Sequence, residues 1–366
     1  MSLEVVIDDL SSDQGPYAAV AAASPHALIY HSVTYGRFLK AMMPAARCEY
    51  LVAQEGDRPV AALPTFALAH PQHGTVVNSL PFYGSHGSIL CLPDAPAGAV
   101  DALMDAFHAR NRAGGVVAAT IVGNPEAPPP SPPAGPQPDL IDRRIGQFTP
   151  LPAGSNRSAM EDALFAQYHQ KTRNMVRKGL KSDYRFREDT SPAMFAELER
   201  MHVDGMRAIG GKWKEPAFFA AVQSAFQAGR DYRLFVAETS EGGVAAMLLM
   251  LYHCGYAEYF VPVSDADHRS NQPLSALIHH AMLTSILEAG STCWNWGGTW
   301  LSQDGVYRFK SRWGTVDKEY DYKVWLYPEN GDVTRLTRAE LANGYPQFFV
   351  VPYSALASEH ARDDHA

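Results

Sequence analysis

Apolar and polar positions follow a regular order in the C-terminal half of the chain. Three strand-like apolar runs come first, at residues 232–238, 244–252 and 256–262. Apolar residues at helical spacing follow over Pro273–Ala289, and a short strand-like run then covers Thr292–Trp296. The alternating residues of Glu319–Leu326 predict one more strand. This order predicts a meander of three strands and a helix that crosses over to a fourth strand beside the third.

The N-terminal half has its own order of helices and strands. The predicted helices are Leu28–Met43 and Ala99–Arg112, and the predicted strands are Tyr50–Ala53, Val60–Ala69 and Val116–Val122. Pro44 ends the first helix, and the polar residues 55–58 predict a hairpin turn between the first two strands. A helix followed by a meander favours an α+β fold with mixed, mostly antiparallel sheets flanked by helices.

The length of the chain predicts more than one domain. A chain of 366 residues is expected to form two domains, each with its own core. A dense run of prolines at 125–138 can form neither a helix nor a central strand, so it predicts a stiff connection. We therefore expect a first domain over residues 1–145, a second over 146–340 and an extension over 341–366, with a frayed end from Ser358.

The composition argues against several classes of function. Hydrophobic residues make up 46% and charged residues 19% of the chain, as in ordinary globular proteins. The formal net charge of −8 argues against general nucleic-acid binding, although a local basic patch could hold one phosphate-bearing ligand. The N-terminus lacks the basic start and apolar block of a signal peptide, so we expect a cytoplasmic protein.

The sequence lacks the motifs of several common chemistries. The four cysteines are scattered, without a CxxC pair, which argues against a zinc site and a disulfide framework. His279-His280 lies inside an apolar helix without a Glu-x-x-His partner, so no metal is expected. No Gly-x-Ser-x-Gly elbow and no phosphate-binding glycine fingerprint occurs, which argues against a serine hydrolase and a nucleotide-binding fold.

The stretch Trp294–Trp313 combines aromatic and basic residues and holds four of the six tryptophans. A short apolar-aromatic run is expected to end at Gly297-Gly298, and a polar loop then leads into an aromatic and basic turn at 307–310. Bulky rings beside fixed positive charge suit a cleft for a polar, anionic substrate. A tryptophan-rich core strand followed by a solvated turn is the alternative interpretation.

A second stretch, Glu161–Lys181, concentrates positive charge on a predicted helix. Four of its polar side chains fall near one line, Lys171, Asn174, Lys178 and Lys181, with Arg173 and Arg177 one turn apart beside it. Like charges this close repel one another, so a bound anion such as a phosphate would stabilise the helix. A solvated basic face is the alternative interpretation.

Several of these segments resemble the FemAB-like aminoacyl and acyl transferases. Residues 171–178 are similar to the basic helix of that family. Residues 296–298 followed by 305–314 are similar to its C-terminal signature, in which an aromatic-x-Phe-Lys turn ends in Trp-Gly. Residues 31–39 and the glycine- and serine-containing loop at 80–87 are similar as well, so the resemblance extends over most of the chain.

The resemblance implies a fold, a reaction and some site residues. The fold would be two tandem domains of the GNAT acyltransferase type, the first degenerate and the second holding an acyl donor between its third and fourth strands. The reaction would transfer an acyl or aminoacyl group to an amine of a cell-envelope precursor. In the family the lysine of the Phe-Lys pair, here Lys310, stabilises the transition state. The basic helix would contact substrate phosphate through Arg173, Arg177 and Lys178.

The residues leave the acyl donor open. The long helical hairpin arm of family members that use aminoacyl-transfer RNA is absent, which argues against that donor. A CoA donor would call for a glycine-containing turn before the helix at Pro273, but residues 269–272 contain no glycine. The N-terminus of that helix could still hold an anion. We expect no bound cofactor, and a donor that is either acyl-CoA or an aminoacyl or acyl carrier.

Acyl transfer to an amine develops negative charge on the carbonyl oxygen of the donor. A preformed cation beside that oxygen contributes about 3–4 kcal/mol, and Lys310, held in place by Phe309 and Tyr307, is the expected source. The residues expected to line the substrate cleft are Tyr256, Tyr259, Trp296 and Gly298. The two tyrosines are expected to share one face of their strand.

No general base stands out in the sequence. Glu258, His268 and Asp304 fall near the predicted cleft, but each is interpreted as a surface or structural polar residue. The proton of the attacking amine would then go to the leaving oxygen or sulfur of the donor itself.

Three functions are open on the sequence alone. The leading one is a FemAB-like N-acyltransferase or aminoacyltransferase that acts on an amine of a cell-envelope or exopolysaccharide precursor. The second is a CoA-dependent GNAT-type acetyltransferase of a small amine or sugar. The third is a non-catalytic protein that holds a phosphosugar or a lipid carrier on the basic helix. The expected partner is a small molecule or precursor with phosphate, and a lipid-linked precursor would bring the protein to a membrane surface.

Overall fold

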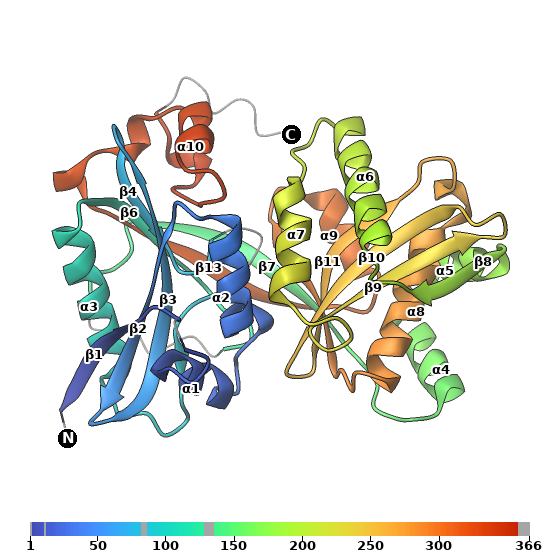
Figure 1. The fold of residues 1–366 in the computed structure, drawn as a ribbon, viewed down its shortest axis with the longest axis horizontal. Helices are drawn as coiled ribbons and strands as arrows, with labels where there is room; N and C mark the ends of the chain where they lie inside the picture. The colour runs from blue at the N-terminus through green and yellow to red at the C-terminus, as the bar shows by residue number, and fades with distance from the viewer. Residues whose placement is uncertain (1, 11, 82–85, 128–134, 358–366) are drawn as a thin grey trace. The chain divides into compact units, whose positions relative to one another are not determined.

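The chain forms two compact units in the computed structural model. The described residues are 2–10, 12–81, 86–127 and 135–357. One unit contains residues 1–144 and 319–365, and the other contains residues 145–318. The chain passes into the second unit within strand β7 (Leu140–Pro150) and returns within strand β13 (Val316–Leu326) (Figure 1). The first unit is therefore built from two separate parts of the chain.

This division differs from the one expected from the sequence after residue 318. The sequence places residues 319–340 in the second domain, whereas in the structure they belong to the first unit. The reason is that residues 322–326 of β13 pair antiparallel with β6 (Val116–Val122). Residues 128–134 of the proline run and residues 82–85 of the glycine-containing loop lie outside the described part of the chain.

The first unit contains strands in the order β1-β2-β3-β4-β6-β13. The strands not yet named are β1 (Leu3–Asp8), β2 (Arg47–Glu55), β3 (Arg58–His70), β4 (Gly74–Asn78) and the short β5 (Leu90–Cys91), which pairs with β3. Neighbours are antiparallel except β4 and β6, which are parallel because α3 (Ala99–Ala113) crosses between them. The predicted hairpin at 55–58, the helix from Ala99 and the buried strand at 116–122 are confirmed.

Helices cover both faces of the first unit's sheet. On one face lie α1 (Pro16–Ala23) and α2 (Val33–Met42), and the ring of Tyr17 packs 4.3 Å from that of Tyr50 between centroids. On the other face lies α3 (Figure 1). Its Leu103 and Phe107 pack in one core with residues of β2, β3 and β4. The buried apolar residues of each helix supply the core on its own face of the sheet.

A third part of the first unit's core comes from the C-terminal residues. Helix α10 (Arg338–Gly344) and the residues after it pack on β4, β6 and β13, with Leu341, Tyr345 and Val350 buried. Part of the predicted C-terminal extension therefore packs in the core. Its expected frayed end, residues 358–366, lies outside the described residues.

The second unit contains strands in the order β7-β12-β11-β10-β9-β8. The strands not yet named are β8 (Tyr184–Glu188), β9 (Tyr232–Thr239), β10 (Val244–His253), β11 (Tyr256–Ser264) and β12 (Cys293–Trp300). Strands β9, β10 and β11 form the predicted antiparallel meander. Helix α8 (Pro273–Leu287) then crosses over and brings β12 parallel to β11, as the hydrophobic pattern predicts.

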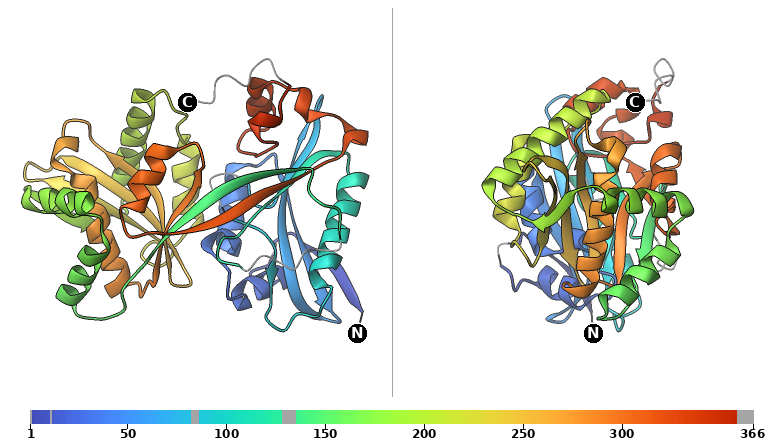
Figure 2. Two further views of the ribbon diagram at one scale, coloured as in Figure 1. Left: turned by 180° about the vertical axis from the view of Figure 1, so that it is seen from behind. Right: turned by 90° about the vertical axis from the view of Figure 1, so that its right-hand side faces the viewer.

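Helices cover both faces of this sheet as well. On one face lie α8, α4 (Arg157–Gln167) and α5 (Gln170–Lys181), and on the other lie α6 (Pro192–Ala208) and α7 (Pro216–Ala225) (Figures 1 and 2). The basic helix expected over residues 161–181 is thus two helices. The break follows α4 at Tyr168, whose buried side chain joins the core beneath α8.

Two local predictions in the aromatic stretch are wrong. The strand expected to end at Gly297-Gly298 continues to Trp300, and the turn expected at 307–310 is helix α9 (Asp304–Ser311). Gly297 has a φ of +74°, and β12 continues through it. A glycine adopts this conformation within a strand without steric cost. Short 3-10 helices lie at Ile29–His31, Arg269–Asn271, Pro328–Asn330, Val333–Arg335 and Tyr353–Ala355.

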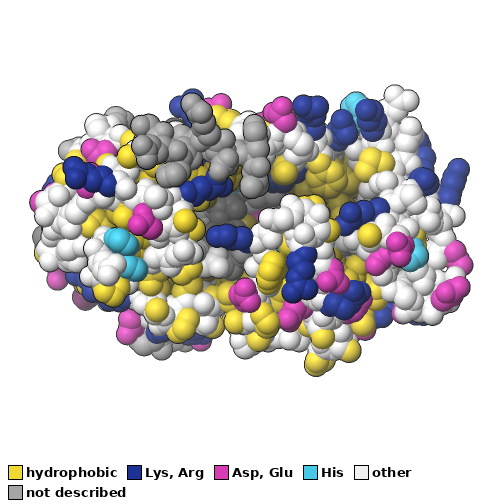
Figure 3. Space-filling view, turned by 90° about the horizontal axis from the view of Figure 1, so that it is seen from above, with side chains coloured by type: hydrophobic (Ala, Val, Ile, Leu, Met, Phe, Trp, Pro, Cys, Tyr) yellow, Lys and Arg dark blue, Asp and Glu magenta, His cyan; other side chains and the backbone are white. Residues whose placement is uncertain are grey.

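The surface of the described residues carries mixed charge. On the face shown in Figure 3, lysine and arginine side chains are interspersed with acidic and apolar ones. In the part of the chain that the structure describes, no helix combines the length and the apolar character needed to span a bilayer.

Candidate active site

The parallel strands β11 and β12 of the second unit separate soon after they begin. They pair at three positions, from Tyr256 opposite Cys293 to Glu258 opposite Asn295. Beyond that point β11 runs on to Ser264 and β12 to Trp300 without pairing to each other. The corresponding parallel pair of the first unit, β4 and β6, stays paired up to the last residue of β4. Only the second pair of strands therefore has the divergence that the resemblance associates with an acyl donor.

A β-bulge accounts for the separation. The register of β10 against β11 shifts between Leu249 and Met250, so that Phe260 of β11 has no partner residue. A bulged strand bends at the extra residue. Phe260 is two residues beyond Glu258, the last residue that pairs with β12, and its ring packs 5.5 Å from that of Phe218 on α7. The bulge therefore lies just beyond the last residue of β11 that pairs with β12, where the two strands begin to separate.

Lys310 projects from α9 to the backbone of β12 just beyond the point of separation. Its side chain is buried, with 7% exposed. The ammonium donates to Thr299 Oγ1 at 2.9 Å, to the carbonyl of Gly298 at 3.1 Å and to that of Gly297 at 3.5 Å. In the described part of the chain its partners are these neutral oxygens alone. Burial lowers the pKa of Lys310 to about 8.

Strand β7 supports this arrangement, and the sequence analysis gave it no role. Gln147 accepts a hydrogen bond from Thr299 Oγ1 at 3.1 Å, so it orients the hydroxyl whose oxygen faces the ammonium. Thr149 accepts from Trp296 Nε1 at 2.9 Å and donates to the Trp313 carbonyl at 3.1 Å. The only signal in the sequence is that Gln147 and Thr149 stand at alternate positions, on either side of Phe148.

The two rings expected to brace Lys310 have other roles. Phe309 packs in the core, with its ring 5.9 Å from that of Trp296 and edge-on to it. Tyr307 donates its hydroxyl proton to Asp317 at 2.6 Å, and this hydrogen bond raises the pKa of Tyr307. The ammonium is thus held by backbone carbonyls and a threonine, while the rings fix the helix that carries it.

The expected shared face of Tyr256 and Tyr259 is wrong. The two residues are three positions apart in an unbroken register, and successive residues of a strand face opposite sides, so an odd separation places them on opposite faces. Tyr259 lies on the α8 side, with its ring 4.9 Å from that of Trp296. Burial raises the pKa of Tyr259. Trp296 itself is 2% exposed, and Gly298 supplies a carbonyl to Lys310.

Glu258 is the buried carboxyl at the point where the strands separate. It is 1% exposed and accepts a hydrogen bond from Asn295 Nδ2 at 3.1 Å. The Asn295 side chain in turn accepts from the backbone N–H of Gly297 at 2.8 Å. A chain of hydrogen bonds therefore links Glu258 to one of the residues that hold Lys310. The other two candidates make different contacts, because His268 bonds to Tyr184 and the exposed Asp304 pairs with Arg308.

The basic residues of α5 divide into two groups. Arg173 donates to the Tyr168 carbonyl at 2.6 Å, which satisfies the C-terminal end of α4. Arg177 is exposed, with its guanidinium 5.3 Å from the centre of the Phe165 ring. The remaining polar residues expected on one line are all exposed, Lys171, Asn174, Lys178 and Lys181. The structure thus presents a solvent-facing basic surface with Arg173 withdrawn from it.

Helix α5 meets the first turn of α8. A methyl group added to Gly179 would lie 2.5 Å from the Gln272 carbonyl and 2.7 Å from Ala276 Cβ, so the two helices are in close contact. Gln272 caps α8 in the left-handed conformation, with φ +61°. A helix N-terminus carries partial positive charge. Lys178 and Lys181 are one and two positions from Gly179 on α5. These basic residues therefore lie on the part of α5 that meets the positive end of α8.

Comparison with known proteins agrees with this geometry. Residues 166–311 match the family described as acetyltransferase (GNAT) domain. These residues form a domain with the GNAT fold. The match begins in α4 and ends in α9, so it includes both the divergent strands and Lys310. No curated protein matches the chain by sequence.

The similarity to solved structures extends over most of the chain. A crystal structure of FemX has a TM-score of 0.66 at 15% sequence identity and covers 88% of this chain and 97% of that one. A conserved protein of unknown function from Bacteroides thetaiotaomicron VPI-5482 has a TM-score of 0.55 at 12% identity and covers 88% of this chain and 100% of that one. The chain therefore has the predicted α+β architecture of two tandem GNAT-like domains.

The arrangement around Lys310 is suited to stabilising negative charge. When the buried ammonium is protonated, its neutral partners provide no counter-ion, so its field is weakly screened in surroundings of low dielectric constant. Such a group interacts more strongly with a developing oxyanion than a solvated lysine does. The GNAT domain thus places a preformed cation next to the strands that separate.

Proposed function

We propose that the chain is an N-acyltransferase or aminoacyltransferase that acts on an amine of a phosphate-bearing cell-envelope or exopolysaccharide precursor. The observation that carries the proposal is Lys310, a buried ammonium held by neutral oxygens beside the divergent β11 and β12. Membership of residues 166–311 in the GNAT family supports acyl transfer as the reaction class.

In the proposed reaction the donor carbonyl lies between the separating strands, near Gly298. The nitrogen of a neutral amine attacks the carbonyl carbon, and the carbonyl electrons move to oxygen. Lys310 then donates to that oxyanion, with the N–H that now makes the weakest contact, 3.5 Å to the Gly297 carbonyl. Collapse of the tetrahedral intermediate expels the donor oxygen or sulfur, which takes the proton lost by the amine.

Two features of the second unit support a phosphate on the substrate. The exposed basic residues of α5 and the positive end of α8 occur where these helices meet at Gly179. An anionic group there would interact with both charge sources at once. Because Arg173 is bound to the end of α4, we assign the phosphate contact to Arg177 and Lys178.

A CoA-dependent acetyltransferase of a small amine or sugar is the second candidate. The description of the matching family as an acetyltransferase domain favours it. In that case the pyrophosphate of CoA would take the place of the precursor phosphate at the N-terminus of α8. Both candidates use Lys310 in the same way and differ in the donor that is consumed.

The decisive experiment compares the wild type with Lys310→Met. Methionine keeps the length of the side chain and removes the charge, so the fold should persist while the oxyanion loses its cation. We expect kcat to fall about 100-fold or more with little change in KM. Untargeted metabolite comparison of cells with each protein identifies the acylated product, and Lys40→Met, an exposed lysine of α2, is the matched control.

The outcomes separate the candidates. Loss of an acylated or aminoacylated envelope intermediate in the Lys310→Met strain supports the leading function, and consumption of acyl-CoA by the purified protein supports the second. Binding of a phosphosugar that survives the substitution, with no turnover of any donor, contradicts both and favours a non-catalytic carrier.

A further inference from the structure

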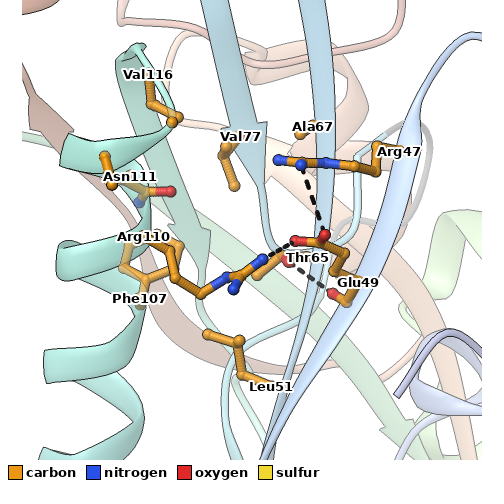
Figure 4. A pocket seen from close by; sticks show the side chains of 12 residues that line it. Arg47, Glu49, Leu51, Thr65, Ala67, Val77, Phe107, Arg110, Asn111 and Val116 are labelled. Carbon is orange, nitrogen blue, oxygen red and sulfur yellow. Dashed lines mark hydrogen bonds and ion pairs between the residues drawn. The ribbon is translucent and has the colours of Figure 1, made fainter. Parts of the chain in front are cut away.

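The first unit contains a cavity that has no part in the proposed reaction. It has a volume of about 250 Å³ and lies between the C-terminal turn of α3 and strands β2, β3 and β4 (Figure 4). It exists because small residues stand where α3 leaves the sheet, Ala67 on β3 and Ala113-Gly114 at the end of the helix. The cavity belongs to the first unit, whereas Lys310 belongs to the second.

The floor of the cavity is apolar and its rim is charged. Leu51, Val77, Phe107 and Val116 form the floor and are part of the hydrophobic core of the first unit. Arg47 and Glu49 of β2 and Arg110 of α3 form the rim, and the two guanidinium groups reach toward the one carboxylate (Figure 4). Such a combination fits a ligand with a charged head and a short apolar body.

The charges on the rim do not balance. Arg110 Nη2 contacts Glu49 Oε2 at 2.7 Å, which is a hydrogen-bonded ion pair. Arg47 Nη1 is 3.6 Å from Glu49 Oε1, beyond hydrogen-bond range. Among the described residues Arg47 makes no hydrogen bond, so its planar set of N–H donors faces solvent at the rim. Two guanidiniums and one carboxylate leave an excess of one positive charge.

We propose that this cavity binds a small organic carboxylate. The carboxylate accepts hydrogen bonds from Arg47, with Arg110 as a second donor, and a short branched apolar body lies against Val77 and Phe107. The single excess positive charge matches a monoanion. The apolar floor offers no hydrogen bonds to water, so an apolar body that displaces this water is favoured. Inorganic phosphate would use the rim alone and leave the floor solvated.

The test measures binding of 3-methylbutanoate to the full chain by titration calorimetry and ligand-detected NMR. The uncharged isostere 3-methylbutanamide and inorganic phosphate are the comparison ligands. We expect the carboxylate to bind and both comparison ligands to bind at least about tenfold more weakly. Arg47→Gln should weaken the binding of 3-methylbutanoate by a similar factor. Arg58→Gln is the matched control, because Arg58 is an exposed arginine of the same unit that pairs with Asp94 at 2.9 Å, outside the cavity.

A second variant tests the floor without touching the charges. Ala67→Leu fills the cavity from β3 and should abolish binding while the thermal unfolding midpoint stays near that of the wild type. If this variant unfolds, Arg47→Gln still tests the proposal. The Arg47 side chain is 61% exposed, so the substitution leaves the core intact. The proposal is overturned if the carboxylate does not bind, if the amide or phosphate binds as well as the carboxylate, or if Arg58→Gln has the same effect as Arg47→Gln.

Discussion

At the scale of single residues, the burial of Lys310 makes the stability of the fold depend on pH. Burial lowers its pKa from the usual 10.5 to about 8. Between these values the unfolded chain binds a proton that the folded chain does not, so stability rises as pH increases from about 8 to about 10.5. The full difference is about 3 kcal/mol. We expect urea unfolding to show the wild type gaining stability relative to Lys310→Met over this range.

The comparison with Lys310→Met isolates one lysine. Lys214 also has its pKa lowered to about 8 by burial, and it contributes the same pH dependence to both proteins. Its contribution therefore cancels in the difference between them. Free energies of unfolding that run parallel from pH 8 to pH 10.5 would show that Lys310 stays protonated in the folded protein.

Thr299 gives a second prediction at this scale. Its hydroxyl oxygen makes the shortest hydrogen bond to Lys310 and its proton goes to Gln147. Thr299→Val removes an acceptor from the charged form of Lys310, so the pKa of Lys310 should fall further. It also leaves the buried Gln147 oxygen without its donor, at a cost of about 1–3 kcal/mol in stability. In a pH profile of acyl transfer, the apparent pKa at which the rate falls at alkaline pH should be lower in Thr299→Val. Thr299→Ser should restore it.

The sequence predicted Lys310 but not the residues that hold it. Lys310 stands out because a lysine next to aromatic residues forms a recognisable local motif. Gln147 reaches Lys310 through Thr299, from a strand about 160 positions earlier, and Thr149 on the same strand bonds to Trp296, so these contacts exist only after folding. The faces of Tyr256 and Tyr259 were predicted wrongly because the strand period of two separates residues three apart.

At the scale of elements, the contact between α5 and α8 depends on a glycine. A methyl group at position 179 would meet the Gln272 carbonyl at 2.5 Å, and backbone cannot move aside cheaply. Gly179→Ala should therefore destabilise the protein by about 1–3 kcal/mol, although alanine favours helix. Gly205 inside α6 has open space at the same position, so Gly205→Ala should stabilise by about 0.5–1 kcal/mol. Thermal unfolding of both variants checks the sign of each change.

The order of elements in the second unit follows from its sequence, but two boundaries do not. The meander and the crossover helix are long periodic segments, so their type can be predicted from local pattern. Gly297 predicts the end of a strand, yet β12 continues through it. A glycine can adopt a positive φ within a strand, and the sequence alone does not show that it does so here. Residues 304–311 read as a turn, and their helical form becomes evident only when Phe309 packs on Trp296.

At the scale of the whole chain, the first unit is completed by residues that follow the second. Strand β13 pairs with β6, and Leu341 and Tyr345 enter the same core. A sequence read in order assigns these residues to the nearer domain, because no local signal marks a strand that pairs with a segment about 200 positions earlier. The division of the chain therefore could not be predicted from composition or spacing.

This discontinuity leads to a prediction about fragments. Residues 1–144 alone lack β13 and the C-terminal core, so β6 becomes an edge strand with its apolar face open, and the fragment should unfold without cooperativity. Joining residue 144 to residue 319 through a short glycine-serine linker should restore a cooperative transition. The two ends lie close together, because Arg143 contacts Glu319 at 3.8 Å and Asp321 at 3.5 Å. Circular dichroism during heating measures both proteins, and a linked form that melts as gradually as the fragment would show that the first unit needs the second in order to fold.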